Sequence, residues 1–593
     1  MTLVLLIPLL LQAPPQDSAA LVKAAKRAQA QYEYLARSRA PIRMAPSGRQ
    51  PCDEVVGRFC LFFDSNERDT PLPPEPLPAT RARKEAVVAL TRAAERSPME
   101  ARVARSLVRD LVEDGRPAEA LQAARRFAWA TADTLWGRLL LGFALHAVEE
   151  DTAAEREFAA AVPRLPERER KRLRIDALLS PDERARVRRL EGTARASYEA
   201  ALWRLSDPLY LTPGNERWVE HVARYVWSRM LEEAPVVTGM LSWGDDLEEL
   251  TLRYGVPRGR ERTPSFGMGF EPDRLVERYD PASLAFVPES LLLAGVRGPP
   301  DPGAPWEAEA LRSRTGYAPS AARKVVHLAH QLSRFPAGDS VVVRVDASLP
   351  LDSLAEGAAT APAGMFVLPG PAALLRGDTA EVSEVRARAS AVDSGHALAV
   401  TMQATLPPGS YVYSAEALEP RSRLAGVARH SVVLLARAGR PALSDILVAF
   451  PFPAGAAPKG RDDAALRGRG NLAIDVGETV GLYAEVSGLA AAPGDIRRYR
   501  VQLELVPLEA PPAPARAVSW LARALGLAKG GTRQVRLAWS GEAPATLQPV
   551  VLTTNLELPR VSPGLYGLTV TVTDAVGGGS ARSERHIRIA ARH

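Results

Sequence analysis

Three alanines, Ala86, Ala120 and Ala154, lie 34 residues apart, and small or apolar residues recur four and seven positions after each of them. Positions 0, 4 and 7 share one face of an α-helix. A 34-residue period is typical of arrays of helical hairpins, in which each hairpin buries its apolar face by stacking on the next. The sequence therefore predicts a helical array over residues 81–195.

This pattern resembles that of tetratricopeptide repeats over two and a half units. Its main departure concerns the turn inside a hairpin, because Gly115 has no glycine equivalent before Ala154. A simple bundle of three or four helices is the alternative interpretation.

The chain has 593 residues, enough for several domains with cores of their own. Its 75 basic and 69 acidic residues leave a net charge of +6, too small over this length to indicate nucleic-acid binding. Fifty prolines and 43 glycines indicate many turns. We therefore expect a multidomain α + β protein that does not bind nucleic acid.

Residues 1–20 begin with an apolar run too short to cross a bilayer as a helix. The run is typical of a secretory signal peptide, although it has no Lys or Arg before it. An uncleaved, weakly anchored N-terminus is the alternative. No other transmembrane segment is expected, and the predicted location is periplasmic or secreted.

The two cysteines, Cys52 and Cys60, lie close together in the N-terminal segment, residues 21–80. Their spacing in a chain with no other cysteine predicts a disulfide bond formed in an oxidising compartment. This agrees with export.

The second half of the chain consists of short alternating or apolar runs separated by Pro-Gly, Asp and Ser turns. These runs predict two β-sandwiches, at 336–455 and 470–593, which divide near residues 451–463. In LPPGSYVY and VSPGLYGLTV a Pro-Gly turn precedes a strand with an inward tyrosine, which resembles immunoglobulin-like modules. Residues 301–335 are expected to be a linker and a short helix.

Between the helical array and the sandwiches, residues 196–300 resemble the GWxTD domain, a bacterial envelope domain of unknown function. The matching residues are Trp203, Asp207-Pro208, Thr212-Pro213, Asn215-Glu216, Arg224, Trp243-Gly244-Asp245-Asp246 and Arg253-Tyr254-Gly255-Val256-Pro257. Ser242 and Asp245 depart from the glycine and threonine of the motif. The resemblance implies a small central α/β domain and supplies no catalytic residues.

Adjacent carboxylates such as Asp245 and Asp246 diverge on a helix or strand, so they are poorly placed to share one proton transfer. We expect Asp246 to cap the helix that follows and Trp243 to anchor it, and either Thr212 or Asn215 to cap an earlier helix. The alternative is a ligand-binding groove, for which the candidate residues are Trp203, Asp207, His221, Trp243 and Asp246.

His327 and His330 would share one face of the short helix expected there, but no third metal ligand accompanies them. The sequence therefore predicts no metal site, no cofactor and no catalytic residues.

Together these features predict a non-enzymatic interaction or scaffold protein of the cell envelope. Its partners would be envelope proteins or peptides bound by the helical repeats. The alternatives are a hydrolase or ligand-binding activity in the groove of the GWxTD-like domain, and a chaperone-like subunit of a surface-assembly system.

Overall fold

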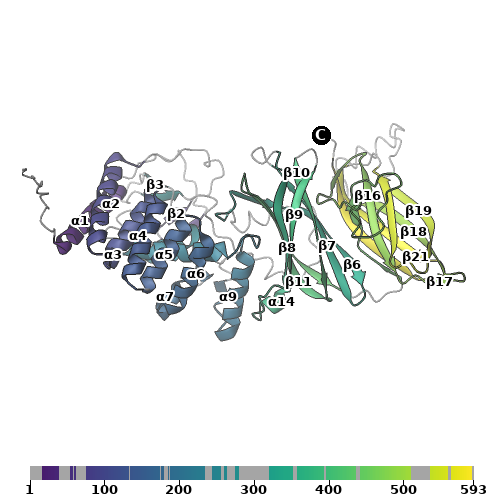
Figure 1. The fold of residues 1–593 in the computed structure, drawn as a ribbon, viewed down its shortest axis with the longest axis horizontal. Helices are drawn as coiled ribbons and strands as arrows, with labels where there is room; N and C mark the ends of the chain where they lie inside the picture. Colours follow the sequence, from purple (N-terminus) through teal and green to yellow (C-terminus); the bar gives the residue numbers. More distant parts are fainter. Residues whose placement is uncertain are drawn as a thin grey trace, which may run out of the picture.

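A computed structural model shows a multidomain α+β protein, with helices gathered at one end and two β units following in a row (Figure 1). No described helix combines the length and the apolar character that a membrane crossing requires. The structure describes residues 17–38, 54–57, 59–61, 75–132, 134–173, 175–178, 184–185, 187–233, 243–255, 259–263, 274–278, 319–351, 357–392, 396–435, 441–508, 535–558 and 563–590.

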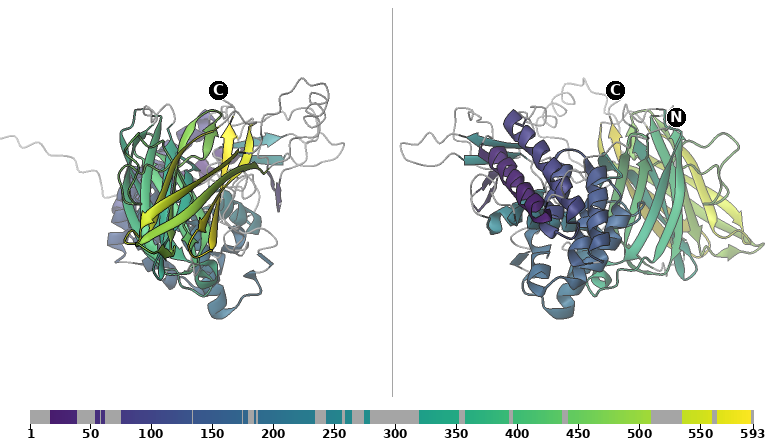
Figure 2. Two further views of the ribbon diagram at one scale, coloured as in Figure 1. Left: turned by 90° about the vertical axis from the view of Figure 1, so that its right-hand side faces the viewer. Right: turned by 60° about the vertical axis from the view of Figure 1, so that its left-hand side comes forward.

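The helical array begins earlier than residue 81, because α1 packs along α2 as the first helical pair. Helix α1 lies at the end of the array farthest from the β units (Figures 1 and 2). The helices of the array are α1 (Ser18–Ser38), α2 (Leu77–Arg96), α3 (Ala101–Glu113), α4 (Pro117–Ala130), α5 (Leu135–Ala147) and α6 (Asp151–Ala161).

The 34-residue period is visible in the structure. Helices α3 and α5 begin 34 residues apart, and so do α4 and α6. Ala86, Ala120 and Ala154 lie on α2, α4 and α6 and are fully buried. The periodic alanines therefore mark equivalent core positions in successive hairpins.

The turn inside each hairpin uses the same backbone conformation with different residues. Gly115, between α3 and α4, has a φ of +70°, and Glu149, 34 residues later between α5 and α6, has a φ of +64°. Glycine adopts this left-handed conformation at little cost, whereas other residues are strained in it. The second hairpin thus keeps the left-handed backbone conformation of Gly115, although a glutamate stands at the equivalent position.

Packing within the hairpins also follows the repeat. At Gly142 on α5, an added Cβ would lie 2.6 Å from Cε1 of Phe158 on α6. One repeat earlier the corresponding residues are Val108 and Ala124, both fully buried. In the earlier repeat the larger side chain lies on the first helix of the hairpin, and in the later repeat it lies on the second. The exchange keeps the filled volume similar.

This exchange predicts non-additive mutations. Gly142→Val should destabilise the protein by about 1–3 kcal/mol through overpacking, and Phe158→Ala by about 3–5 kcal/mol through the cavity it leaves. The double variant recreates the Val108–Ala124 pair and should cost at least about 1 kcal/mol less than the sum of the two. Urea unfolding measures all three, with Val88→Ala on the exposed side of α2 as a control. Additive effects would contradict the equivalence.

Residues 196–300, expected to form a separate central domain, are divided between two cores where they are described. Helix α10 (Glu216–Glu232) and the end of α11 (Asp245–Tyr254) belong to the core of the helical array. Helix α9 (Gly192–Ser206) instead packs on the first β unit, in a core that includes Phe366 and Val412.

The other elements described before the β units are short. They are α7 (Glu167–Arg172), two 3₁₀ turns, η2 (Val162–Arg164) and η3 (Ile175–Leu178), and two strand pairs, β1 (Glu54–Val56) with β2 (Phe59–Leu61) and β3 (Gly259–Thr263) with β4 (Arg274–Arg278).

Two expectations about the N-terminal region lie outside the described residues. Residues 1–16, which hold most of the predicted signal peptide, are not described, and neither is Cys52. Cys60 lies on β2, but its side chain is not described. The signal peptide and the Cys52–Cys60 disulfide therefore stay predictions.

The first β unit is one sheet that curls around a core. Its strand order is β5-β12-β11-β8-β9-β10-β7-β6. Strands β5 and β6 are consecutive in the chain, yet β5 pairs with β12 and β6 with β7, so residues 324–337 join the two edges of the sheet. The strands are β5 (Lys324–His327), β6 (Ala329–Ala337), β7 (Ser340–Pro350), β8 (Thr360–Pro369), β9 (Ser383–Val392), β10 (Ala397–Leu406), β11 (Gly409–Glu419) and β12 (Leu424–Leu434), with the short helix α14 (Pro371–Leu374) after β8.

The short helix expected before residue 335 is wrong, because residues 324–337 form β5 and β6. The i, i+3 spacing of the histidines suits a helix, but the strand pairings on both sides determine the structure here. The domain boundary also moves. Strands β13 and β14, expected in the first sandwich, pair with β16 of the second unit.

The second β unit consists of two sheets that share one core. The first sheet contains β13 (Ala442–Leu443), β14 (Leu447–Ala449), β16 (Thr479–Ser487) and β20 (Val550–Glu557). The second contains β15 (Ala473–Asp475), β17 (Ala491–Ala492), β18 (Ile496–Pro507), β19 (Val535–Pro544), β21 (Gly564–Asp574) and β22 (Ser580–Ala590). The two expected inward tyrosines are confirmed: Tyr411 and Tyr566 lie buried in the cores of the first and second units.

Candidate functional site

The five candidate residues come from three helices, and contacts join only some of them. Trp203 lies near the end of α9 and His221 on α10, and their ring centroids are 5.0 Å apart. Asp207 follows α9 directly, in the segment that leads to α10. Trp243 and Asp246 lie at the start of α11.

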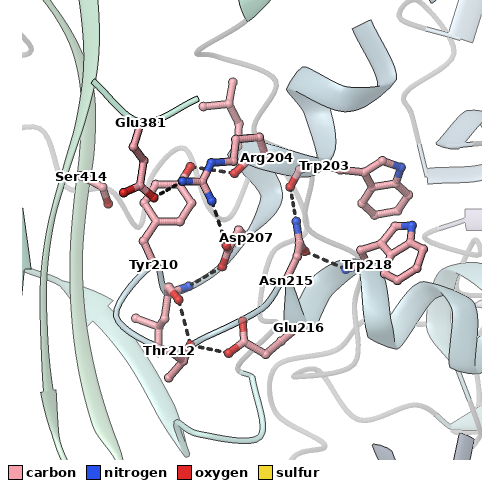
Figure 3. A network of polar contacts seen from close by, with 12 residues as sticks. Trp203, Arg204, Asp207, Tyr210, Thr212, Asn215, Glu216, Trp218, Glu381 and Ser414 are labelled. Carbon is pink, nitrogen blue, oxygen red and sulfur yellow. Dashed lines mark hydrogen bonds and ion pairs between the residues drawn. The ribbon is translucent and has the colours of Figure 1, made fainter. Parts of the chain in front are cut away.

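The segment between α9 and α10 is held by its own polar side chains (Figure 3). Asn215 caps α10: its Oδ1 accepts a hydrogen bond from the Trp218 amide at 2.9 Å, and its Nδ2 donates to the Trp203 carbonyl at 2.7 Å. Of the two expected caps, Asn215 is therefore the one used. Thr212 instead donates to the Leu209 carbonyl and contacts the Glu216 carboxylate.

Two carboxyl groups of this segment are closed off from solvent. Asp207 is 1% exposed and Glu216 is 2% exposed. Burial and the nearby Glu216 carboxylate raise the pKa of Asp207 well above its usual value, although Arg429 opposes this effect. Burial likewise raises the pKa of Glu216 to about 8. Raised carboxyl pKa values are common in active sites, but also in buried structural networks.

The segment is fastened to the first β unit by a buried ion pair. Arg429 on β12 donates from Nη1 to the carbonyls of Leu205 and Asp207, at 2.7 and 2.8 Å. Its Nη2 lies 3.1 Å from the Glu416 carboxylate on β11. We call these two residues the Arg429–Glu416 clamp.

The remaining hydrogen-bonding positions of the clamp are also used. Glu416 accepts from the Leu211 amide at 3.0 Å and from the Ser414 hydroxyl at 2.6 Å. The Arg429 guanidinium lies 3.9 Å from the centroid of the Tyr210 ring. Buried charges are tolerated when they are paired and hydrogen-bonded, as both are here. The arrangement positions the backbone between α9 and α10, and it leaves neither charge open to a substrate.

His221 is a buried neutral imidazole. Its Nε2 donates to the Leu173 carbonyl at 2.9 Å, and its Nδ1 is buried without a hydrogen-bond partner among the described residues. Burial and the positive charge of Arg217 lower its pKa to about 3. A catalytic triad needs a hydroxyl nucleophile at one ring nitrogen and a carboxylate at the other, whereas here Nε2 meets a backbone carbonyl and Nδ1 meets neither group among the described residues.

Trp243 and Asp246 contact other parts of the helical end. Trp243 is partly buried against the core of the array. The cap of α11 is Gly244, so the expectation that Asp246 caps this helix is wrong: Asp246 lies in the first turn and accepts from the Leu247 amide at 2.8 Å. Gly57 packs so closely that a Cβ there would be 2.4 Å from the Asp246 Cβ. An acidic first turn is nonetheless favourable beside the positive end of the helix dipole.

Helix α10 covers the face that α3 and α5 present. The rings of Phe143 on α5 and Trp227 on α10 lie 5.6 Å apart, and Arg109 on α3 donates to the Met230 carbonyl at 3.3 Å. The face formed by the first helices of successive hairpins, which could receive a peptide, is thus occupied by the chain itself.

His146 on α5 fastens α10 to the array. It lies between Asp151 and Glu220, with nitrogen–oxygen distances of 2.6 and 2.8 Å. Hydrogen bonds to both carboxylates overcome the opposing effect of burial and raise its pKa to about 10, so that it is charged at neutral pH. Glu220 in turn pairs with Arg224, which donates to the Arg253 carbonyl of α11.

Sequence reasoning missed Glu416, Arg429 and His146. Glu416 and Arg429 each interrupt a stretch of mostly small or apolar strand residues, and charges in such positions are a signal that could have been read. His146 offers no comparable signal. Among the described residues, no cluster of three or more His, Cys, Asp or Glu side chains is arranged to hold a metal ion.

No protein-family model matches the sequence, and no curated protein matches it. Among solved structures, the chain is similar to Escherichia coli alpha-2-macroglobulin activated by porcine elastase, with 13% identity over 47% of this chain and 23% of that chain and a TM-score of 0.13. It is also similar to red sea bream transglutaminase, with 11% identity over 59% of this chain and 43% of that chain and a TM-score of 0.13. The alignments span less than half of each of those chains, and TM-scores this low define neither fold nor function.

The raised pKa of Glu216 predicts a pH-dependent stability. Its folded-state pKa of about 8 lies above its usual value of 4.5. Stability should therefore fall as the pH rises from about 4.5 to about 8, because the unfolded chain releases this proton while the folded protein retains it. Glu216→Gln, which cannot ionise, should stabilise the protein by about 2 kcal/mol or more at pH 9 and by little at pH 5. Thermal unfolding at both pH values measures this, with Glu119→Gln on the exposed side of α4 as a control. An equal effect at both pH values would contradict the buried, protonated state.

Proposed function

We propose that this chain is an exported, non-enzymatic scaffold protein of the cell envelope, periplasmic or secreted, that binds other proteins through its helical array. The observation that carries the proposal is the Arg429–Glu416 clamp, which fixes the helical end on the first β unit through buried and fully bonded charges. A buried ion pair with its hydrogen bonds made tolerates little displacement. Rigid spacing between units is what a scaffold requires.

Export is supported by the sequence alone, through the apolar run within residues 1–20 and the Cys52–Cys60 pair. The GWxTD-like motif, Trp243-Gly244-Asp245-Asp246, points to the same compartment. We propose tetratricopeptide-like packing for the array, in keeping with the 34-residue period, and an immunoglobulin-like fold for the second β unit, whose two sheets share one core.

Because α10 covers the face of α3 and α5, a partner needs another part of the array. The side chain of Trp129 near the end of α4 is 90% exposed, and that of Met99, two residues before α3, is 67% exposed. Helices α3 and α4 form one antiparallel hairpin, so both residues lie at the same end of it. Tryptophan is among the residues most enriched at binding hot spots. We call this pair the Met99–Trp129 surface.

The charges beside this surface suggest the chemistry of the partner. Arg125 and Arg126 are exposed and lie one helical turn before Trp129, on the same side of α4. A protein segment with apolar side chains flanked by acidic residues would complement both features.

The alternative of a hydrolase or a ligand-binding groove receives less support. Asp207 and His221, two of the titratable residues proposed for that groove, are each only 1% exposed. A catalytic acid or base must reach the proton it transfers. A chaperone-like subunit of a surface-assembly system would use an exposed apolar surface of the kind proposed here.

The proposal is tested by photo-crosslinking in envelope fractions. A photoreactive phenylalanine analogue at position 129 should yield one reproducible protein adduct, which Met99→Glu should abolish. The same analogue at position 547, where Leu547 is 47% exposed on the second β unit, is the matched control. No adduct, or the same adducts at both positions, would contradict the proposal.

Once the partner is purified, Trp129→Ala should weaken its binding by about 30-fold or more, as expected for a hot spot worth about 2 kcal/mol. The same variant should change stability by less than about 0.5 kcal/mol, because the side chain is exposed. Isothermal titration and urea unfolding separate the two effects.

A further inference from the structure

Three partly buried histidines and one buried tyrosine from four strands gather on one face of the first β unit. His327 lies on β5, His330 on β6, Tyr413 on β11 and His430 on β12. The centroids of the His330 and His430 rings are 5.2 Å apart and the rings are stacked, and the His327 ring lies 6.0 Å from His330 and 6.5 Å from His430. The cluster therefore brings together residues about 100 positions apart in the sequence.

Strand register places this cluster on the core side of the sheet. His430 is paired with Tyr413, and His330 with Ala347, and both partners belong to the core of the first unit. Directly paired residues on antiparallel strands project to the same face. The cluster lies where residues 324–337 pass from one edge of the sheet to the other.

His330 uses both of its ring nitrogens within the protein. Its Nε2 lies 2.8 Å from the Tyr413 hydroxyl, and its Nδ1 lies 3.1 Å from the Leu328 carbonyl. Because the carbonyl can only accept, Nδ1 carries the proton and the neutral ring accepts from Tyr413 at Nε2. This arrangement suits a neutral imidazole and leaves no lone pair of His330 for a metal ion.

The charges that act on the cluster are positive. Arg585, on β22 of the second unit, repels a proton on His330, and the imidazoles repel one another. The neighbouring carboxylate, Asp445, is engaged by Arg334 of β6 at 2.7 Å. Tyr413 stays neutral at ordinary pH because burial raises its pKa. Protonation of His330 or His430 is therefore opposed by positive charge, and no carboxylate among the described residues offsets this.

Strand β6 connects the cluster to the joint between the two β units. On its opposite face, Gln331 exchanges hydrogen bonds with Val448, and the ring of Phe335 lies 6.0 Å from that of Tyr483. Arg585 donates to the Leu332 carbonyl of β6 at 2.9 Å and to the Ile446 carbonyl at 2.9 Å. Movement of β6 would disturb both faces at once.

We propose that the stacked pair His330 and His430 within this cluster is an acid-sensitive latch, which is closed while both imidazoles are neutral and opens the joint between the two β units when they are protonated. Positive charge on the stacked imidazoles would repel neighbouring rings and Arg585 and break the hydrogen bond from Tyr413 to His330. Strand β5 would then separate from β12, and the contacts that β6, the next strand, makes with the second unit would weaken.

The direction of the pH dependence follows from burial. Burial and neighbouring positive charge lower the pKa of His330 to about 4 and that of His430 well below 6.5. A histidine with a lowered folded-state pKa leaves stability unchanged above about pH 6.5 and reduces it as the pH falls toward 4, because the open state takes up the proton. For His330 alone, the opening equilibrium should rise about 30-fold between pH 7 and pH 5.

Hydrogen exchange followed by mass spectrometry tests the latch in the full-length protein. Amides of residues 329–337 and 445–449 should lose about 30-fold or more of their protection at pH 5 relative to pH 7, after correction for the intrinsic pH dependence of exchange. The double variant His330→Gln/His430→Gln should lose less than threefold. His396→Gln, at an exposed histidine of the same unit, should behave like the unaltered protein.

A second measurement covers the case in which the double variant does not fold. The Cε1 proton resonances of His330 and His430, followed by NMR in the unaltered protein, should show no titration above pH 5 while the joint is closed. Titration near pH 6.5 without loss of protection would overturn the proposal. Equal protection at pH 7 and pH 5, or equal losses in the double variant and the unaltered protein, would overturn it as well.

Discussion

The contact between Arg429 and the carbonyls of Leu205 and Asp207 determines how the two halves of the molecule are joined. A guanidinium removed from water must find acceptors for its donors, and here it finds two carbonyls and the Glu416 carboxylate. The contact lies between α9, which packs on the sheet, and α10, which packs in the helical array. The position of the array relative to the first β unit therefore depends on one buried charge.

The two β units are joined by a different means. One face of β6 belongs to the core of the first unit, and the other face carries Gln331 and Phe335 toward the second unit. A strand that packs against other residues on both faces cannot shift without losing packing on both sides. Both joints thus use elements that belong to two cores, which explains why the boundaries expected from composition and spacing did not coincide with the units seen in the structure.

The period of the helical array could be read from the sequence because each hairpin is a local structure with repeated core positions. The left-handed turn at Glu149 could not, since the residue type favours another conformation and only the surrounding hairpin imposes this one. The strands that carry His327 and His330 were not predicted, because the spacing of the two histidines suits a helix. The partner of β5 is β12, about 100 residues further along the chain, whereas β6 pairs with the next strand, β7; in both cases strand pairing overrides the local spacing.

The helix that Asn215 caps could be predicted from the sequence, but the burial of Asp207 and His221 could not. Asp207 is closed off by Arg429, which lies 222 residues further along the chain. The chemistry of a carboxylate depends on whether water reaches it, and no local pattern reports a contact of that range.

Helix α10 also has a consequence for how the protein is made. The hairpins from α1 to α6 consist of neighbours in sequence and can assemble as they leave the ribosome. The apolar face of α3 and α5 is covered only when residues 216–232 have been synthesised, more than 100 residues after α3. Until then the array carries an uncovered apolar surface, and a fragment ending at residue 195 would carry it permanently. The smallest self-sufficient helical fragment therefore includes α10.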